Sequence, residues 1–544
     1  MATSPASSSS AEAAPDVLVQ VLEILEDTHD DLKTCGPAVT SLLSRLFNLI
    51  NTALGPPSYS LARSTQLKDS TTLASSLLRL ADEKLNSFPY RDVPRCWRRL
   101  YTDATLLGAI AQLAGAEEMG TKEEKKELEE TVKKLDLAIV IAGAPGEGRE
   151  ELVFALMEVA QGRLRATTAP TTSPSSPPRK KRRLSPSSAS EPLPPPYIYR
   201  PFPEPSSLPS RLDLPCPSSS APPAPFSPSH PHCSPFVVRA AASPSTGWPA
   251  VDRWRDLGYL QEQAGPGRVV PVEVGGDYTK EGWGQRLMPF DEFLNSLSPP
   301  PASSSPSCTA TDATPPPPPI YYLAQHSLFR QFPSLLSDFS VPDLVYSAPS
   351  TDGAGGAYEG VQNEEGYVVN AWFGPGGTKS AAHQDPWWNC YVQVTGSKWV
   401  WVAPPSCAAS MAAFGSSASP DPSSPTSPSS VNAAETAKGA GASDKAEQYM
   451  TNTSSLDVTV PPPLPSASSS PALPTAPPGS TPAGPAPRDE VEEKTAYYPP
   501  DWLANVEPLS RQVVLGPGDV LVMPPRWWHA MQSLETSFSV SIWF

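Results

Sequence analysis

The sequence predicts an α+β protein with two domains, a helical domain at 16–162 and a β domain at 235–544. In the first part, apolar residues recur every three or four positions, which is the period of a helix that buries one face. In the second part, short runs of β-branched and aromatic residues alternate with Gly, Pro and Asp, a pattern typical of a barrel or sandwich of many strands. Tracts rich in proline and serine separate and interrupt these parts.

Composition limits the classes of protein that fit. The 544 residues include 71 prolines and long Ser/Ala tracts, which cannot form packed cores. A net charge of −16 argues against a general nucleic-acid binder, which needs a basic face. The seven cysteines form no CxxC pair, which favours reduced thiols in an intracellular protein over a disulfide framework. We also expect no membrane span and no signal peptide, because neither apolar pattern is present.

The helical domain contains no nucleophile, ligand pair or phosphate loop that stands out. We therefore expect an interaction module or a packing appendage, preceded by disorder at 1–15. The stretches with helical periodicity are 17–25, 39–47, 71–85, 92–115, 122–142 and 147–162.

A linker at 163–232 contains five consecutive basic residues, Arg179 to Arg183. An exposed, flexible basic run is what the acidic groove of a nuclear import receptor binds, so the sequence predicts a nuclear protein, with sharing between nucleus and cytoplasm left open. The alternative is a solvated charge run without a partner.

The β domain is predicted to form many short strands. Three low-complexity inserts, at 298–318, 406–445 and 459–490, must loop out of any compact fold, and we expect them to be disordered. The last run alternates strictly, which predicts a core strand at the C-terminus. The strand-like runs are 236–238, 269–274, 367–369, 389–394, 398–402, 519–523 and 538–544.

His383 and Asp385 are two positions apart, so on a strand both side chains would lie on one face and could reach the same ion. The alternative is a polar turn that happens to hold both residues. His529 follows a Gly-Pro-Gly-Asp turn, the strand-like run 519–523 and a Pro-Pro break, which puts it just beyond a strand end. His529 is the best candidate for a third ligand. The alternative is that His383 and His529 are unrelated.

Two histidines and one carboxylate form the facial triad of non-haem Fe(II) oxygenases. The triad leaves three metal positions open, two for a chelating co-substrate and one for O2. A structural zinc site would prefer four ligands, often Cys, and the nearest cysteine, Cys390, faces away from Asn389 on an alternating strand.

The co-substrate of such an oxygenase is commonly 2-oxoglutarate, a dianion whose distal carboxylate needs a cation. Lys398 follows a Gly-Ser turn at the start of the run 398–402. If this run pairs antiparallel with 389–394, Lys398 could point back toward the metal. The alternative is a solvated turn lysine.

On these residues the chain resembles the jumonji-C family of iron- and 2-oxoglutarate-dependent oxygenases. Together the similar blocks span most of 235–544 apart from the inserts, and a weaker likeness covers 96–104 in the helical domain. The matching blocks are 270–279, 322–329, 370–378, 383–386, 452–458 and 537–541.

The resemblance implies a double-stranded β-helix, the cupin or jelly-roll core, with Fe(II) held by His383, Asp385 and His529. It also implies that Trp372 and Trp543 lie near the substrate entrance, although ordinary barrel packing explains them equally well. His326 looks structural. The residues that match 2-oxoglutarate contacts are Tyr278, Ser380, Asn389 and Lys398.

Trp387 and Trp388 depart from the family, whose members carry smaller polar residues there. We expect this pair to narrow or reshape the rim of the pocket. The inserts on either side of 452–458 enlarge a loop that could cover or block the substrate channel.

The resemblance implies a protein oxygenase that acts on a basic side chain in a histone, ribosomal or chromatin protein. Arginine C-hydroxylation is the favoured reaction, and demethylation of N-methyl-lysine is the alternative. Two further alternatives are a nuclear interaction scaffold with a vestigial cupin core and a cupin that binds another metal without 2-oxoglutarate.

Overall fold

The structure is a computed structural model of the chain. Residues 1–13 of the predicted disorder at 1–15, the basic run 179–183 and the insert 298–318 fall outside the residues that it describes. Residues 14 and 15 belong to a helix, Ala14–Glu26, so the predicted end of the disorder is two residues too late. Most of the linker and most of the inserts at 406–445 and 459–490 fall outside them too. The described residues are 14–26, 30–55, 60–89, 92–115, 121–168, 212–213, 234–279, 282–297, 319–346, 358–414, 452–460 and 498–544.

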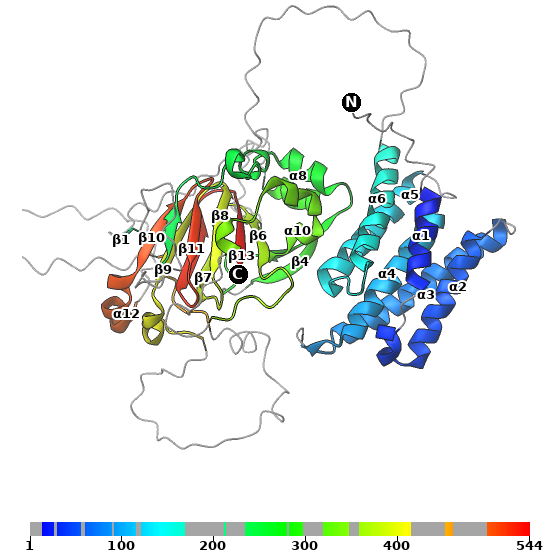
Figure 1. Cartoon of the computed structure of the whole chain (residues 1–544), viewed down its shortest axis with the longest axis horizontal. Coiled ribbons are helices and arrows are strands. Elements are labelled where there is room, and N and C mark those ends of the chain that lie inside the picture. The colour runs from blue at the N-terminus through cyan, green and yellow to red at the C-terminus, as the bar shows by residue number, and fades with distance from the viewer. Residues whose placement is uncertain are drawn as a thin grey trace, which may run out of the picture.

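The N-terminal part is a helical bundle, and each predicted helical stretch overlaps a helix of it (Figure 1). The stretches 92–115 and 147–162 start before their helices, which begin at 95 and 149, and 122–142 spans an α-helix and a π-helical segment. Helix α4 is the centre of the bundle, because Leu100, Leu106 and Ile110 are fully buried on it. Among the described helices, none combines the length and the apolar character that a membrane crossing requires. The helices are α1 (Ala14–Glu26), α2 (Pro37–Leu54), α3 (Ser60–Leu85), α4 (Arg95–Gly115), α5 (Thr121–Leu137), a π-helical segment η4 (Ala138–Ala142) and α6 (Arg149–Thr168).

Helix α6 ends at Thr168, so the predicted boundary between helical domain and linker at 162 is too early. Leu164 is 1% exposed and belongs to the apolar core of the bundle. The Arg163 side chain donates a hydrogen bond to the carbonyl oxygen of Leu113 at 2.6 Å. These contacts extend the helix past Gly162, where composition alone favours an end.

The β domain consists of two sheets, with strand orders β1-β10-β9-β12-β7 and β2-β11-β8-β13-β6-β5-β3-β4 in the described residues. The short strand β1 lies in the predicted linker and pairs in parallel with β10, so this part of the linker is ordered. The strands are β1 (Leu212–Asp213), β2 (Phe236–Val238), β3 (Val269–Val274), β4 (Gly284–Pro289), β5 (Tyr321–His326), β6 (Val368–Gly374), β7 (Lys379–Gln384), β8 (Asn389–Thr395), β9 (Lys398–Ala403), β10 (Arg511–Leu515), β11 (Val520–Met523), β12 (Trp528–Ser533) and β13 (Ser537–Trp543).

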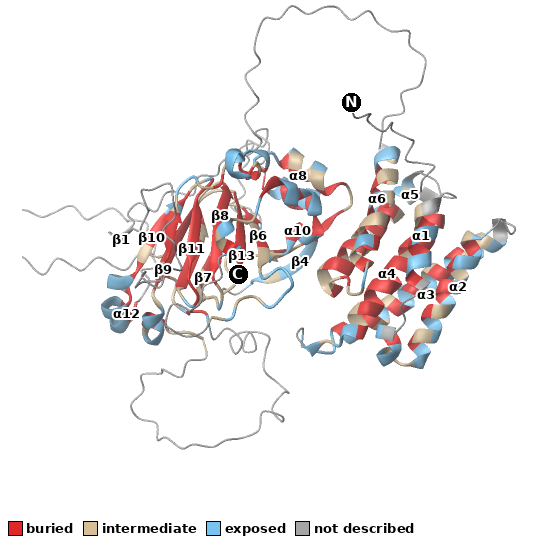
Figure 2. Cartoon of the chain, in the orientation of Figure 1, coloured by how far each residue is buried: buried red, intermediate tan, exposed pale blue. Residues whose placement is uncertain are grey.

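The inner faces of the two sheets share one interior, because Tyr391 on β8, Val400 on β9 and Met531 on β12 belong to one buried cluster. This arrangement confirms the expected two-sheet cupin core. Figure 2 shows how thoroughly these strands are buried.

The larger sheet places its apolar residues on the outer face. On β13, Phe538, Val540 and Ile542 join a core that includes residues of α7 (Ala250–Arg253), α8 (Leu257–Ala264) and α9 (Phe290–Ser296). The residues between them, Ser539 and Ser541, therefore face the interior. The apolar core of this sheet thus lies between its outer face and the helices. The inner face can therefore carry polar side chains.

The first residues of the predicted insert at 406–445 are ordered, so this insert begins later than expected. The short helix η8 (Pro405–Ser410) and the residues after it contribute Cys407 and Met411 to a buried cluster. The cluster also holds Trp401 from the outer face of β9 and Trp502 from α12 (Pro500–Asn505). Burial of these side chains fixes a segment whose composition resembles a linker.

Candidate metal and co-substrate site

Strands β7 and β12 are antiparallel neighbours, and they bring His383 opposite His529. Asp385 is the first residue after β7, and its carbonyl oxygen accepts a hydrogen bond from the Arg526 backbone N–H at 2.7 Å. His529 lies beyond the end of β11, as the sequence predicted, and is the second residue of β12. His383 is on β7, and Asp385 lies just past the end of that strand.

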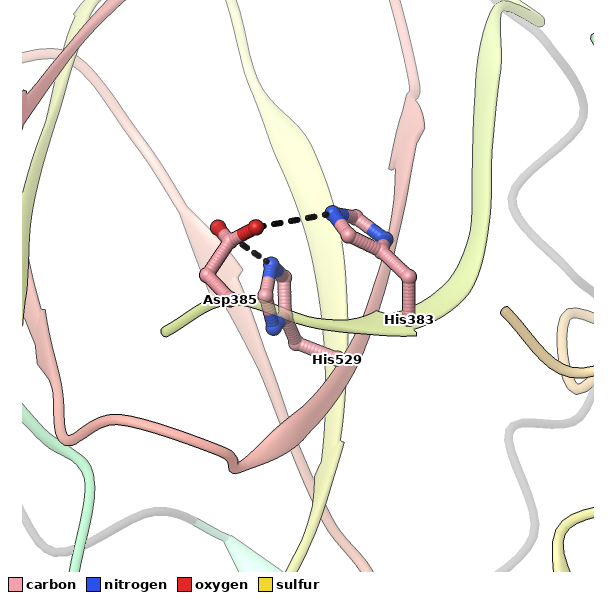
Figure 3. Close-up of side chains that lie close together, drawn as sticks. All are labelled: His383, Asp385 and His529. Carbon is pink, nitrogen blue, oxygen red and sulfur yellow. Dashed lines mark ion pairs between the residues drawn. The ribbon is translucent and has the colours of Figure 1, made fainter. Parts of the chain in front are cut away.

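The side chains of His383, Asp385 and His529 converge on one point (Figure 3). The Asp385 carboxylate lies 3.9 Å from Nε2 of His383 and 3.5 Å from Nε2 of His529. One potential ligand atom from each residue lies within 4.8 Å of the others, and within the described part of the chain no other group of three such residues does so. The triad expected from the sequence is thus brought together.

Backbone carbonyls fix the orientation of both imidazoles. Nδ1 of His383 lies 2.8 Å from the carbonyl oxygen of Ala381, and Nδ1 of His529 lies 3.0 Å from that of Trp527. A carbonyl oxygen only accepts, so each Nδ1 carries the proton and each Nε2 presents its lone pair to a metal. This is the supporting contact that metal-binding histidines usually have.

Electrostatics act differently on the two histidines. Burial, with help from the charge of His529, lowers the pKa of His383 to about 4, so this ring is neutral at pH 7. Burial also lowers the pKa of His529, but the hydrogen bond and charge of Asp385 outweigh burial and raise the pKa overall. Metal binding requires the neutral form of His529, in which Nδ1 keeps the proton. Burial opposes ionisation of Asp385, but the hydrogen bond from His529 and the charges of both histidines lower the pKa of Asp385.

A β-bulge in β7 turns Ser380 toward the interior. His383 pairs with His529, but Ser380 pairs with Met531, so β7 has one residue more than β12 in this interval. In a regular strand, side chains three positions apart point to opposite faces of the sheet. The extra residue of the bulge brings them to the same face. Ser380 therefore shares the inner face of the sheet with His383.

Lys398 is buried, with 1% of its surface exposed, so it is not a solvated turn lysine. Its Nζ donates hydrogen bonds to the hydroxyl oxygens of Tyr391 at 2.8 Å and Tyr322 at 3.2 Å. Burial lowers the pKa of Lys398 to about 7, and in the described part of the chain no carboxylate offsets that effect.

The strand pairing that the sequence suggested for Lys398 is wrong. Strand β9 pairs with β10 and β12, whereas β8 pairs with β11 and β13 in the other sheet. Lys398 and Tyr391 thus meet across the interior between the sheets. Sequence reasoning missed Tyr391 and Tyr322. The alternation of side chains along a strand could have identified Tyr391, because Tyr391 lies on the same face of β8 as Asn389.

Two buried amides in the interior lack hydrogen-bond partners among the described residues, at Oδ1 of Asn389 and Nδ2 of Asn370. An amide has an acceptor oxygen and a donor nitrogen, so either end of Asn389 can face a ligand. Unpaired buried polar atoms are costly, and their presence here indicates a place for a polar ligand.

Tyr278 has an acidic environment that includes a metal-ligand candidate. Burial raises the pKa of Tyr278, a hydrogen bond with Thr453 opposes this, and the charges of Asp277, Glu273 and Asp385 raise the pKa further.

Trp372 and Trp543 line the interior from neighbouring strands. The indole N–H of Trp372 donates to the Ser541 hydroxyl at 2.9 Å, and the indole N–H of Trp543 is buried without a partner in the described residues. Only Trp387 of the unusual pair reaches this region, with its ring centroid 5.3 Å from that of Trp543. Trp388 is 1% exposed and packs in the outer core, so the expectation that both narrow the rim is wrong for Trp388.

His326 stands apart from the metal ligands. Its Nε2 lies 2.7 Å from the side-chain oxygen of Gln331, which fits the structural role expected for it.

A model of the cupin-like domain family matches residues 226–544. The chain is 29% identical over 297 residues to Jumonji C domain-containing protein 5 of Drosophila melanogaster, covering 55% of this chain and 52% of the fly protein. It is 28% identical over 297 residues to Lysine-specific demethylase 8 of Xenopus tropicalis, covering 55% and 45%. With Lysine-specific demethylase 8 of Danio rerio it shares 26% identity over 465 residues, covering 85% and 84%. The chain thus spans about half the length of the fly and frog relatives.

Proposed function

Because the chain belongs to the cupin-like domain family, we propose that it is an Fe(II)- and 2-oxoglutarate-dependent protein oxygenase. His383, Asp385 and His529 would hold the metal, since two imidazoles and a carboxylate suit Fe(II). The observation that carries the proposal is Lys398, a buried cation that faces the same interior and has no carboxylate beside it in the described residues.

The distance between triad and lysine suits a small dicarboxylate. His529 pairs with Val402, and Ser533 pairs with Lys398 on the same two strands. This interval corresponds to about 13 Å of strand, which the lysine side chain and a five-carbon dianion can span together. Lys398 would bind the distal carboxylate as a charged donor, with the hydroxyls of Tyr322 and Tyr391 around it.

The remaining contacts lie nearer the metal. Ser380 and Asn389 face the interior from β7 and β8, and we assign them to the co-substrate as polar donors. We also assign Tyr278 to the co-substrate, because the charge of Asp385 acts on its hydroxyl. When bound, Fe(II) and 2-oxoglutarate would supply activation of O2 and insertion of one oxygen atom into a C–H bond, with succinate and CO2 as the other products.

A basic side chain is the substrate that the surroundings favour. Glu273 on β3 pairs in register with Tyr322, and burial raises its pKa despite a hydrogen bond from Trp283. No cation pairs with Glu273 in the described part of the chain. A guanidinium can bind such a carboxylate through two parallel hydrogen bonds, so we propose arginine C-hydroxylation, with a histone, ribosomal or chromatin protein as substrate.

Demethylation of N-methyl-lysine is the second candidate. The frog and zebrafish relatives carry the name lysine-specific demethylase. A methylated ammonium would suit the aromatic faces of Trp372 and Trp543. Both reactions begin with hydroxylation of a C–H bond.

The full-length protein should turn over 2-oxoglutarate only when Fe(II) is present, with activity lost in His383→Ala and retained in Lys379→Ala. Lys379 is the matched control because it lies on β7 but pairs with Asp457. With histone and ribosomal-protein peptides, mass spectrometry should show one oxygen gained on arginine. Loss of methyl with release of formaldehyde would support the demethylase instead.

Two results would contradict the oxygenase. No iron-dependent turnover in the wild type would support a scaffold with a vestigial core. Full turnover in His383→Ala would disprove the metal assignment.

We further propose that the basic run 179–183, which lies outside the described residues, binds a nuclear import receptor. Alanine at these five positions should move a fluorescently tagged protein from nucleus to cytoplasm. An unchanged distribution would contradict the proposal.

A further inference from the structure

The junction between the helical bundle and the β domain contains a buried ion pair. Asp136 near the end of α5 is fully buried, and Arg268, just before β3, is 5% exposed. Arg268 donates to one Asp136 oxygen from Nη2 at 2.7 Å and from Nε at 2.9 Å. The other Asp136 oxygen accepts from the backbone N–H of Val269, the first residue of β3, at 2.9 Å. The helical bundle thus holds the start of β3 directly.

From Arg268 the contacts continue to β5. Arg268 Nη2 also donates to the carbonyl oxygen of Gln331 at 2.6 Å. The Gln331 amide donates to the carbonyl oxygen of Val269 at 2.6 Å, which leaves its oxygen to accept from Nε2 of His326 at 2.7 Å. His326 is the last residue of β5. One buried network therefore joins Asp136 to the ends of β3 and β5.

The other ends of these strands reach the co-substrate site. Glu273 on β3 pairs with Tyr322 on β5, and the Tyr322 hydroxyl accepts a hydrogen bond from Lys398. Between the two ends, Gln325 has a φ of 46° and the pairing of β5 with β6 shifts register. A non-glycine residue in this region needs surrounding structure to hold it. Contacts at His326 supply that restraint.

We propose that Asp136 is a positioning residue for the co-substrate site. Through Arg268, Gln331 and His326 it sets the position of β3 and β5, and so of the Tyr322 hydroxyl beside Lys398. The helical bundle is then a working part of the oxygenase rather than an appendage. This inference rests on the 2-oxoglutarate site proposed above.

The network should not reach the metal ligands. His383 and His529 lie on β7 and β12, in the other sheet. Loss of Asp136 should therefore weaken binding of 2-oxoglutarate and leave binding of the metal unchanged. General destabilisation of the fold would affect both.

The test uses the full-length chain and two variants. Asp136→Asn leaves Arg268 buried without an opposite charge, which can prevent folding. The double variant Asp136→Leu/Arg268→Met removes both charges at similar volume, but it does not restore the hydrogen bonds to Val269 and Gln331. Dissociation constants are measured for Mn(II), and then for 2-oxoglutarate with Mn(II) bound. We expect the dissociation constant for 2-oxoglutarate to rise about tenfold, because the hydrogen bond between the Tyr322 hydroxyl and the charged Lys398 is misplaced. The dissociation constant for Mn(II) should stay within about twofold of the wild type.

Glu150→Gln is the matched control. Glu150 forms an ion pair with Arg330 at the same junction, with side chains 29% and 46% exposed, and the Arg330 guanidinium also donates to the carbonyl oxygen of Gly143. Its dissociation constants should equal those of the wild type.

Equal binding of 2-oxoglutarate by wild type and Asp136 variants would overturn the inference, as would parallel losses for Mn(II) and 2-oxoglutarate. A wild type that binds no 2-oxoglutarate would overturn the proposed function, and this inference with it.

Discussion

At the scale of single residues, Lys398 has the most unusual environment. Its ammonium is buried against two tyrosine hydroxyls, and its pKa is lowered to about 7 by burial alone. A buried cation is costly unless an anion joins it. The buried ammonium therefore favours binding of an anion. This effect depends on pH, because only the protonated lysine is charged.

Affinity for 2-oxoglutarate should therefore fall as pH rises above 7. The ligand binds the protonated lysine, so binding raises the pKa of Lys398, and below pH 7 the charged form already predominates. Above pH 7 the dissociation constant should rise up to about tenfold per pH unit until the pKa of the complex is reached. Calorimetric titration with Mn(II) bound, from pH 6 to 9, measures this effect.

Lys398→Arg is the control for this titration. Arginine stays charged throughout the range, so its affinity should be lower but nearly independent of pH. The same pH dependence in Lys398→Arg and in the wild type would assign the effect to another group.

At the scale of secondary-structure elements, two irregularities in the strands determine where residues of the candidate site lie. The bulge in β7 turns Ser380 to the face of His383, and the left-handed Gln325 bends β5 beyond Tyr322. Outside the sheets, η8, Val458 and α12 contribute to the cluster of Trp401 and Trp502, which holds together segments far apart in the chain. These features come from contacts between distant segments.

Met411→Ala should destabilise the protein by about 2–5 kcal/mol, because this fully buried side chain fills the cluster beneath η8. Chemical denaturation measures the change. Leu509→Ala, at a position that is 46% exposed, should stay within about 0.5 kcal/mol of the wild type. A Met411 variant as stable as the wild type would mean that η8 contributes little to the fold.

At the scale of the whole molecule, the buried pair of Asp136 and Arg268 joins the two domains. Figure 1 shows the helical bundle beside the β domain, with α6 and α10 (Leu328–Gln331) on the facing sides. Separation of the domains would expose Asp136, Arg268 and Gln161, whose amide donates to the carbonyl oxygens of Ala264 and Pro266. The domains should therefore lose structure together.

Calorimetry should show one unfolding transition for the wild type. Arg268→Met leaves Asp136 buried without an opposite charge, which costs about 3–5 kcal/mol and weakens the coupling, so two transitions are expected. Glu150→Gln should keep the single transition. Two transitions in the wild type would mean that the domains unfold independently.

Sequence reasoning recovered the helices, most strands and the convergence of His383, Asp385 and His529, because periodicity and residue chemistry are local properties. It failed where the local structure depends on contacts between residues far apart in the chain. The end of α6, the order of Cys407 and Met411, and the burial of Trp388 all depend on partners far away in the chain.

The sequence by itself determined the set of candidate metal ligands and the two kinds of domain, since both follow from residue type and spacing. Only the tertiary structure decided which sheet carries Lys398, that Tyr322 and Tyr391 contact it, and that Asp136 holds the strands behind them. Strand order and register arise from packing of the whole chain, and no local pattern specifies which strands become neighbours.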